Sequence, residues 1–343
     1  MPDIVRIVSE ERLIALMTHL LEAAGMSADL ACRAARVLAT ADMRGIVSHG
    51  VRLLPGNIAR IRGGAINPRP AIHEVGGCGA MVILDGDHGL GMAVGSVAMD
   101  RAIELAREHG IGWVNARNTC HYGASGSYVM MAVETGMIGV SISNTLPMMS
   151  IEGTISRTIG NNPLAIGVPG PDFPLVLDMA TSVASLGKIG VTRRAGRPIP
   201  GEWLTQQAAE GQEQVLRHFG GAKGSGLAIM TEVLTGVLAG GCVLHEVRFD
   251  RPREEAEGVS YAQVAIRPDV VLPKAQYEDG MRRLVAQLKA GKPGPDITEV
   301  LLPGERAWRE TLRCRKEGIP IEADVAAALE KSAAELGTSV PWE

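Results

Sequence analysis

The middle of this chain alternates short apolar runs with longer segments of helical periodicity, and this alternation limits the folds available to it. The apolar runs, which are bounded by glycine, proline or polar residues, cover 81–84, 111–116, 138–143, 164–168 and 175–179. Helical patterns over 92–109 and 125–135 separate the first three runs. Buried strands that alternate with helices build a sheet with helices packed on it, so we expect a central α/β domain.

Helical patterns dominate both ends of the chain. Ser9 is placed to cap a first helix that ends at Gly25, and Ser27 is placed to cap a second helix that runs towards Ser48. After Pro303 the chain is helical and charged again. Because 343 residues exceed what one ordinary hydrophobic core supports, we expect two domains.

Four segments of the C-terminal half complete the expected organisation. Residues 193–221 are polar and irregular, which is typical of a surface excursion. Residues 224–238 are apolar on nearly every side and are expected to form a buried helix. A further strand is expected over 262–266 and a helix over 277–290.

The composition excludes several classes of partner. The net charge is −4 and no basic stripe with interleaved aromatics is present, so nucleic acid is not expected as a partner. No apolar run reaches the ~20 residues that span a bilayer, and the start of the chain lacks a signal-peptide pattern. The odd number of scattered cysteines, with no C-x-x-C spacing, indicates reduced thiols in the cytoplasm and no metal site. They are Cys32, Cys78, Cys120, Cys242 and Cys314.

His49 lies in the segment from Asp42 to Arg52, which combines three chemically useful groups. Its imidazole titrates near neutrality, the hydroxyl of Ser48 adjoins it, and the guanidinium of Arg52 follows within one helical turn. Such a set can donate a proton to a carbonyl or imine while the arginine holds a neighbouring carboxylate through two hydrogen bonds. The alternative is that His49 only satisfies a backbone carbonyl at a helix end.

His121 and Asp178 lie at the ends of two expected strands. His121 belongs to residues 119–126, between a strand and a helix, where backbone amides suit an anion. The alternative there is an ordinary loop with a solvent-facing histidine. Asp178 ends an apolar strand, where a buried carboxylate needs a partner. It could fix the tautomer of a histidine, or it could itself be the N-cap of a helix. Cys120 invites interpretation as a nucleophile, although a buried thiol is the commoner role.

Two glycine-rich segments have only part of a phosphate-binding pattern. Lys223 lies among glycines in 220–227, which lacks the spacing of an ATPase phosphate loop but still suits a phosphate or carboxylate. Residues 89–95 follow a strand and open a helix, yet the last glycine is one residue too far for a dinucleotide fingerprint. No acidic residue ends the next strand at the usual distance, so a Rossmann site is not expected there.

Six segments, taken together and in this order, resemble the type-2 malate/L-lactate dehydrogenase family. They cover nearly the whole chain and are 42–52 with 55–56, 121–126, 160–163, 178–182 with 187–188, 220–227 and 302–306. The resemblance implies an oxidoreductase that uses NAD or NADP in a site that is not a Rossmann fold. It also implies a homodimer and a helical domain built from both chain ends. Residues 1–75 and 271–343 would form that helical domain, and residues 76–270 the α/β cofactor domain.

The resemblance also implies roles for individual residues. His49 would be the proton donor and acceptor, with Ser48 and Asp178 as its relay, and Arg52 would bind the substrate carboxylate. His121 matches a position with acid–base duty in the ureidoglycolate branch of the family. The positions that match cofactor-contacting residues are Asn144, Asp178, Met179, Ala180, Lys223, Gly304, Glu305 and Arg306.

The expected substrate is a small 2-oxo or 2-hydroxy carboxylic acid, such as malate, lactate or ureidoglycolate. A reductase of cyclic ketimines, acting on a ring imine beside a carboxylate, is the alternative within the family, and a binding protein without turnover is a third interpretation. The chain departs from the family pattern where Trp203 is followed closely by Lys223, in Gly-Asn-Asn-Pro at 160–163, and at Ser225. These departures leave the substrate and the choice between NAD and NADP open.

Overall fold

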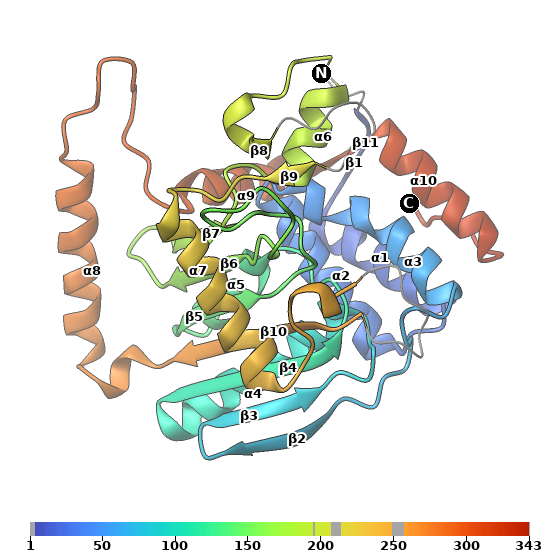
Figure 1. Ribbon diagram of the computed structural model, residues 1–343, viewed down its shortest axis with the longest axis horizontal. Coiled ribbons are helices and arrows are strands. Elements are labelled where there is room, and N and C mark those ends of the chain that lie inside the picture. Colours follow the sequence, from blue (N-terminus) through green and yellow to red (C-terminus); the bar gives the residue numbers. More distant parts are fainter. Residues whose placement is uncertain (1–3, 195, 207–213, 249–256, 343) are drawn as a thin grey trace.

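A single mixed sheet forms the centre of the computed structural model, which describes residues 4–194, 196–206, 214–248 and 257–342. In spatial order its strands are β2 (His73–Cys78), β3 (Met81–Asp85), β4 (Ile111–Thr119), β10 (Val259–Ile266), β5 (Ile138–Ser143), β6 (Leu164–Val168) and β7 (Leu175–Met179) (Figure 1). Within the described residues, β3 and β4 are the only parallel neighbours in this sheet. The mixed α/β class is confirmed, and the sheet is not the parallel, doubly wound sheet of a Rossmann fold.

Most of the predicted helices are also confirmed, with small shifts at their ends. The helices are α1 (Glu10–Ala23), α2 (Ala28–Met43), α3 (Leu54–Arg62), α4 (Gly91–His109), α5 (Ser125–Glu134), α6 (Leu186–Arg194), α7 (Ala222–Glu232), α8 (Lys274–Lys289), α9 (Glu305–Glu317) and α10 (Ala323–Glu335). Ser9 caps α1 by accepting the Arg12 N–H at 3.2 Å. Ser27 occupies the N-cap position of α2 but makes no side-chain bond there. Gly110 ends α4 with φ +85°, which favours glycine.

The two faces of the sheet are covered by different helices. Side chains alternate between faces along a strand. In β4, a Cβ on Gly112 would overlap the Ala102 carbonyl of α4, whereas the Asn115 amide donates to the Leu234 carbonyl at 2.8 Å. Helices α4 and α5 therefore cover one face, while α7 and its π-helical continuation Val233–Val237 cover the other.

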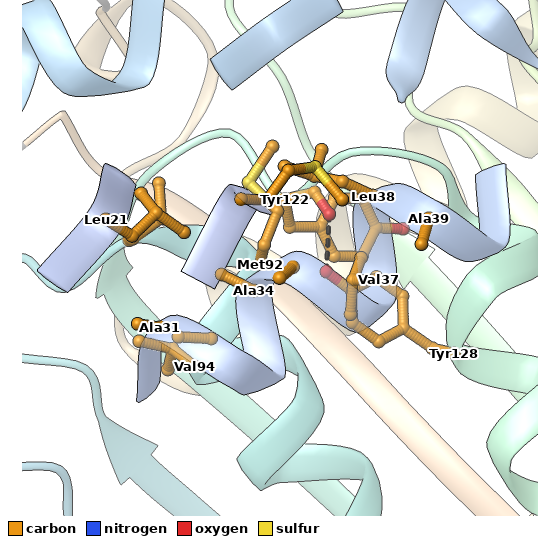
Figure 2. Packing of buried hydrophobic residues seen from close by; sticks show 14 of the residues in the cluster. Leu21, Ala31, Ala34, Val37, Leu38, Ala39, Met92, Val94, Tyr122 and Tyr128 are labelled. Carbon is orange, nitrogen blue, oxygen red and sulfur yellow. Dashed lines mark hydrogen bonds between the residues drawn. The ribbon is translucent and has the colours of Figure 1, made fainter. Parts of the chain in front are cut away.

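The core between the N-terminal helices and the sheet is rich in alanine. Helix α2 presents small residues to α4 and α5, so the helices approach closely (Figure 2). Three of the 4 tyrosines fill the centre: the ring centroid of Tyr122 lies 4.9 Å from that of Tyr128 and 5.0 Å from that of Tyr261. The Tyr128 hydroxyl donates to the Tyr122 carbonyl. This packing holds the loop that carries His121.

The two chain ends lie against each other. Strands β1 (Ile4–Val8) and β11 (Ile319–Glu322) pair as an antiparallel ribbon, α10 contacts α3, and α9 contacts α2. Helix α8 stands apart at the other side of the molecule (Figure 1). Only helices were expected at the chain ends, so these strands correct the prediction; runs this short carry too little periodicity to be recognised. The domain boundaries near residues 75 and 270 stay a prediction.

Two further expectations need correction. Within 193–221, β8 (Leu204–Gln206) pairs with β9 (Val215–Leu216), and Leu204 and Leu216 are buried, so the segment is more than a surface excursion. Residues 207–213 of that segment lie outside the described residues. The helix expected over 224–238 exists, but one side of it is exposed in the single chain, for example at Met230 (55%) and Val237 (59%). Among the described residues, no helix combines the length and apolarity needed to cross a membrane.

Candidate active site

The histidine segment follows α2 through a turn that Gly45 makes possible. Gly45 has φ +73° and donates its backbone N–H to the Asp42 carbonyl, while Ile46 donates to the Ala41 carbonyl. These two bonds form a Schellman motif, which satisfies the last carbonyls of the helix. A 3-10 turn that contains His49 follows directly. The end of α2 therefore sets the position of the imidazole.

Asp42 holds the far side of the same segment. Its Oδ2 accepts a hydrogen bond from the Val51 N–H at 2.7 Å. A Cβ on Gly50 would overlap the Asp42 carboxylate, so a glycine is required at this close approach. Burial raises the pKa of Asp42 to about 7, against the lowering effect of the Val51 bond. The carboxyl group acts as an internal clamp on the loop.

A cavity of about 1310 Å³ lies beside His49. Its wall combines the segment after α2, the loop before α5, the ends of β5 and β7, and the start of α9. The residues predicted from the sequence that line it are His49, His121, Asn144, Asp178, Met179, Ala180, Gly304 and Arg306. Pockets for drug-sized ligands usually measure ~300–1,000 Å³, so this volume suits a large cofactor together with a small substrate.

His49 and His121 come together at this cavity, with ring centroids 5.8 Å apart. Ser48 Oγ lies 2.9 Å from His49 Nδ1, so the hydroxyl engages that nitrogen and Nε2 is the one that a reacting group would meet. Burial lowers the pKa of His49. Burial, with smaller contributions from His49 and Arg60, lowers the pKa of His121 to about 3. Both rings are therefore mainly neutral near pH 7.

Asp178 lines the cavity at the end of β7, with a different partner from the predicted relay. Its Oδ2 accepts the Gly126 N–H at 3.0 Å, at the start of α5. Burial raises the pKa of Asp178, whereas the Gly126 bond and the charge of Arg44 lower it. Among the described residues, Ser48 is bonded to His49 and Asp178 is not. Asp178 thus binds the first turn of α5 from a strand distant in sequence. Ala124 occupies the N-cap position of that helix, so the alternative of an N-cap role for Asp178 is not observed either.

Arg52 does not reach the cavity. Its guanidinium forms an ion pair with Glu322 and donates to Asp324 at 2.7 Å, both in the C-terminal segment around β11 and α10. Two carboxylates thus compensate its charge, and it is absent from the described residues that line the cavity. The carboxylate-binding role implied for Arg52 does not fit this geometry. Arg44, at the end of α2, lines the cavity instead.

Lys223 and Glu305 are also missing from the described part of the cavity wall. The Glu305 carboxylate accepts the Leu302 N–H at 3.0 Å and binds Lys289 Nζ at 2.6 Å. It thereby holds the turn that presents Gly304 and Arg306 to the cavity. Lys223 lies in the first turn of α7. Their cofactor roles stay predictions, and the structural task of Glu305 is an addition to them.

Two features that suggest chemistry in the sequence have structural roles. Cys120 is buried, and burial raises the pKa of its thiol to about 12, so the thiolate that a nucleophile requires is disfavoured. A Cβ on Gly91 would overlap the carbonyl oxygens of Cys120 and His121. That glycine therefore lets α4 approach the His121 loop closely. The described residues contain no group of three side chains placed to hold a metal ion.

Sequence reasoning missed part of the cavity wall. The missed residues include Arg44, Ser125, Thr145, Leu186, Glu310 and Arg313. Arg306, Glu310 and Arg313 repeat at helical spacing on one face of α9, so the periodicity after Gly304 could have identified that face. Arg44 lies just before a helix-ending glycine, a pattern that marks a C-terminal cap. Thr145 and Leu186 carry no comparable signal.

Two partly buried imidazoles, hydroxyl groups and a guanidinium line one cavity, a set of groups that is capable of acid–base chemistry on a small polar ligand. Comparison with known proteins identifies the family to which the chain belongs. The chain belongs to the malate/L-lactate dehydrogenase family, whose sequence profile matches residues 8–330. It is 33% identical over 345 aligned positions to a malate dehydrogenase of Pyrococcus horikoshii, covering 96% of this chain and 95% of that one.

Solved structures of relatives share the fold. Sulfolactate dehydrogenase from Methanocaldococcus jannaschii superposes with a TM-score of 0.89 at 32% identity, over 98% of each chain. Δ1-Piperideine-2-carboxylate reductase from Pseudomonas syringae superposes with a TM-score of 0.85 at 26% identity, over 96% of this chain and 100% of that chain. The chain therefore shares its fold and family with dehydrogenases and reductases.

Proposed function

We propose that this protein is a NAD- or NADP-dependent oxidoreductase that interconverts a small 2-oxo carboxylic acid and the corresponding 2-hydroxy acid. The observation that carries the proposal is His49, bonded to Ser48 at 2.9 Å and paired with His121, on the wall of a cavity of about 1310 Å³. Relatives named malate and sulfolactate dehydrogenases support acids of the malate, lactate or ureidoglycolate type as substrates.

His49 is the proposed proton donor and acceptor. Reduction of a 2-oxo acid builds negative charge on the carbonyl oxygen, and a proton from His49 neutralises it. In the reverse direction the neutral imidazole takes the proton of the hydroxyl group. The lowered pKa of His49 keeps the ring neutral near pH 7, which suits this proton-accepting step. An anionic substrate beside the ring would raise that pKa and favour the donating form.

His121 and Asp178 would support this step from the cavity wall. With a pKa of about 3, His121 stays neutral and can hydrogen-bond to the substrate oxygen without adding charge. Asp178 brings a carboxylate to the same cavity and would stabilise the positive charge that His49 gains on taking a proton. Ser48 would hold the tautomer of His49 through Nδ1.

The cavity suits a nicotinamide cofactor, which when bound would supply or accept the hydride. Met179, Ala180, Gly304 and Arg306 would contact it from the ends of β7 and α9. The Asn144 side chain is used within the protein, since Oδ1 accepts the Ser260 N–H at 2.8 Å and Nδ2 donates to the Cys242 carbonyl at 3.0 Å. Its backbone N–H donates to the Ser260 carbonyl at 3.0 Å and its carbonyl accepts from Ser143 Oγ at 2.8 Å, so a cofactor would meet Asn144 through the remaining lone pair of that carbonyl. Either NAD or NADP is compatible with this description.

We further propose a cytoplasmic homodimer. The thiols of Cys32, Cys78, Cys120 and Cys314 are not joined in disulfides, which suits a reducing compartment. The exposed side of α7 and its continuation is apolar, comprising Leu227, Ile229, Met230, Val233, Leu234, Val237 and Leu238. Ile166 and Leu177 are also exposed and are paired across β6 and β7, on the face of the sheet opposite α5, which is the face that α7 covers. A second copy would cover it, because isologous pairing is the commonest closed arrangement.

A panel assay tests the proposed function. NADH and NADPH absorbance would be followed with malate, lactate, ureidoglycolate, sulfolactate and the matching 2-oxo acids. The expected result is turnover of at least one 2-oxo or 2-hydroxy acid, with a kcat that His49→Ala lowers by about 10²–10⁴-fold. Binding of a nicotinamide cofactor without turnover of any member of the panel would contradict the proposal and support a non-catalytic protein.

A reductase of cyclic ketimines is the second candidate, favoured by the structural match to Δ1-piperideine-2-carboxylate reductase. Its substrate has an imine beside a carboxylate, so the same proton donor and the same carboxylate site would serve. The panel therefore includes ring imines of this type. A kcat/KM for the imine that exceeds those for all 2-oxo acids would select this candidate.

A further inference from the structure

We propose that Arg44 binds the carboxylate of the substrate, in the role that the sequence assigned to Arg52. The inference rests on the proposed function and identifies the group that selects acids at that site. Arg44 lines the cavity that also holds His49, and its side chain comes from the C-terminal cap of α2. Arg44 is only 6% exposed, which is rare for an arginine without a dedicated partner.

The guanidinium of Arg44 has unused hydrogen-bonding capacity. Its Nε is buried without a hydrogen-bond partner, and no hydrogen bond or ion pair joins its side chain to any of the described residues. Burying such a charge is costly unless a partner compensates it. The charge of Asp178 attracts it, but the hydrogen bond of that carboxylate goes to Gly126. A planar, five-donor group held in this state fits an incoming carboxylate.

The other arginines near the cavity are already engaged or lie elsewhere. Arg313 is paired with Glu310 at 2.6 Å, and Arg309 binds Glu305 at 2.6 Å. Arg52 is paired with two carboxylates away from the cavity. Arg306 comes from α9, on the side where the cofactor positions gather. Arg44 therefore combines burial, contact with the cavity and the lack of an ionic partner among the described residues.

The backbone places Arg44 and His49 on one stretch of cavity wall. Arg44, Gly45, Ile46, Val47 and His49 all line the cavity. The Gly45 turn and the Asp42–Val51 bond fix both ends of this stretch. A 2-oxo acid carries its carboxylate on the carbon next to the reacting carbonyl, so its carboxylate ligand and its proton donor must face one small volume. A rigid segment that carries both groups provides that arrangement.

Substitution of Arg44 gives the primary test. Arg44→Lys keeps the charge and loses the planar fork, and Arg44→Gln loses both. With the best 2-oxo acid of the panel, we expect KM to rise by about 10²–10³-fold in Arg44→Gln, with a smaller rise in Arg44→Lys. The preference for the acid over its primary amide should fall by a similar factor. The dissociation constant for NADH or NADPH should change by less than about threefold, because the carboxylate site is separate from the cofactor contacts.

Three further measurements distinguish a binding role of Arg44 from a structural role and from a role of Arg52. Arg33→Gln, on the same helix but paired with Asp29 and Asp100 outside this cavity, controls for loss of a helix arginine. Thermal unfolding separates loss of folding from loss of binding. Arg52→Gln tests the competing assignment directly. A selective rise in KM in Arg52→Gln and not in the Arg44 variants would overturn the proposal. An Arg44→Gln protein that loses kcat or stability but keeps its acid-over-amide preference would also overturn it, because that result defines a structural role beside Asp178.

Binding of oxamate separates this inference from the proposed function. Oxamate is an unreactive isostere of a small 2-oxo acid, and its binding to the protein saturated with NADH or NADPH is measured by quenching of cofactor fluorescence. One outcome is that the panel shows no turnover, yet oxamate binds and Arg44→Gln raises its dissociation constant about 10²-fold. That outcome would support the carboxylate site at Arg44 and contradict the proposed catalytic function. If oxamate binds equally to parent and variant, or to neither, the Arg44 assignment fails.

Discussion

Asp42 accepts the backbone N–H of Val51 at 2.7 Å, and this one bond ties the end of α2 to the chain just beyond His49. Asp42 is 5% exposed, and its carboxylate lies so close to Gly50 that a Cβ on that residue would overlap it. An ionisable group is thus used for positioning, away from the reaction itself.

Asp42→Asn is expected to flatten the pH dependence of the free energy of unfolding. Burial raises the pKa of folded Asp42 from 3.8 to about 7, so its contribution is fully present below pH ~4 and is lost as the pH rises through about 7. Asparagine keeps the acceptor for Val51 without the charge. Urea unfolding at pH 5 and pH 8 should show a smaller difference in the variant. Asp42→Ala should be less stable at both pH values, by about 1–3 kcal/mol.

Gly50→Ala is expected to destabilise the protein by about 1–3 kcal/mol and to reduce turnover, because the new Cβ would displace the Asp42 carboxylate. Gly56→Ala is the matched control, since a Cβ at that position meets nothing within 4 Å and the residue lies inside α3. Alanine should be neutral or stabilising there. Thermal unfolding of both variants is the measurement, and equal stability of the two would refute the clamp.

His49→Ala should lower kcat by about 10²–10⁴-fold while cofactor affinity stays nearly constant, because it removes the proposed proton donor. Ser48→Ala should cost less, about 2–10-fold, since it removes one hydrogen bond to Nδ1. Steady-state kinetics and cofactor titration on the same preparations give the comparison. Near-normal turnover in His49→Ala would show that His49 is not the proton donor.

The pH profile of oxidation should reflect His49. The base form is required to take the hydroxyl proton, and burial lowers the pKa of His49 below 6.5. For oxidation of the 2-hydroxy acid, kcat/KM should therefore rise with pH through one titration below 6.5 and stay level above it. Reduction should show the opposite slope, because it requires the protonated ring. His121, with a pKa of about 3, should add no second step near neutrality. An oxidation profile that is still rising above pH 8 would contradict this assignment.

The strands and helices of the central domain could be predicted because their apolar runs have clear periods, as at 81–84 and 92–109. That His49, His121 and Asp178 share one site is implied by the family resemblance, and the places of His121 and Asp178 at strand ends agree with it. The orientation of the Arg52 side chain could not be predicted, because it depends on ion pairs with Glu322 and Asp324. These two residues are distant in sequence and meet Arg52 only in the folded chain. Likewise, the two short terminal strands form a ribbon only through each other.

The chain is expected to form a homodimer through α7. The exposed apolar side of α7 and the π-helical segment after it, where Met230 is 55% and Val237 59% exposed, is expected to be buried between two copies of the chain. Light scattering of the parent at low micromolar concentration should give twice the chain mass of 36.2 kDa. Met230→Glu combined with Val237→Glu should shift the protein to monomer, because two charges per copy would be desolvated at the interface.

Val75→Glu, at a similarly exposed apolar position on the edge strand β2, is the matched control and should leave the mass unchanged. The variant with both Met230→Glu and Val237→Glu should also affect the candidate active site, because hydrogen bonds connect α7 to the cavity wall. Glu232, the last residue of α7, accepts from the amides of Asn144 at 3.2 Å and Asn162 at 2.8 Å, and Asn144 lines the cavity. Loss of the dimer is therefore expected to weaken cofactor binding more than proton transfer, raising the cofactor KM before kcat falls. A parent protein that is monomeric and fully active would show that this face has another use.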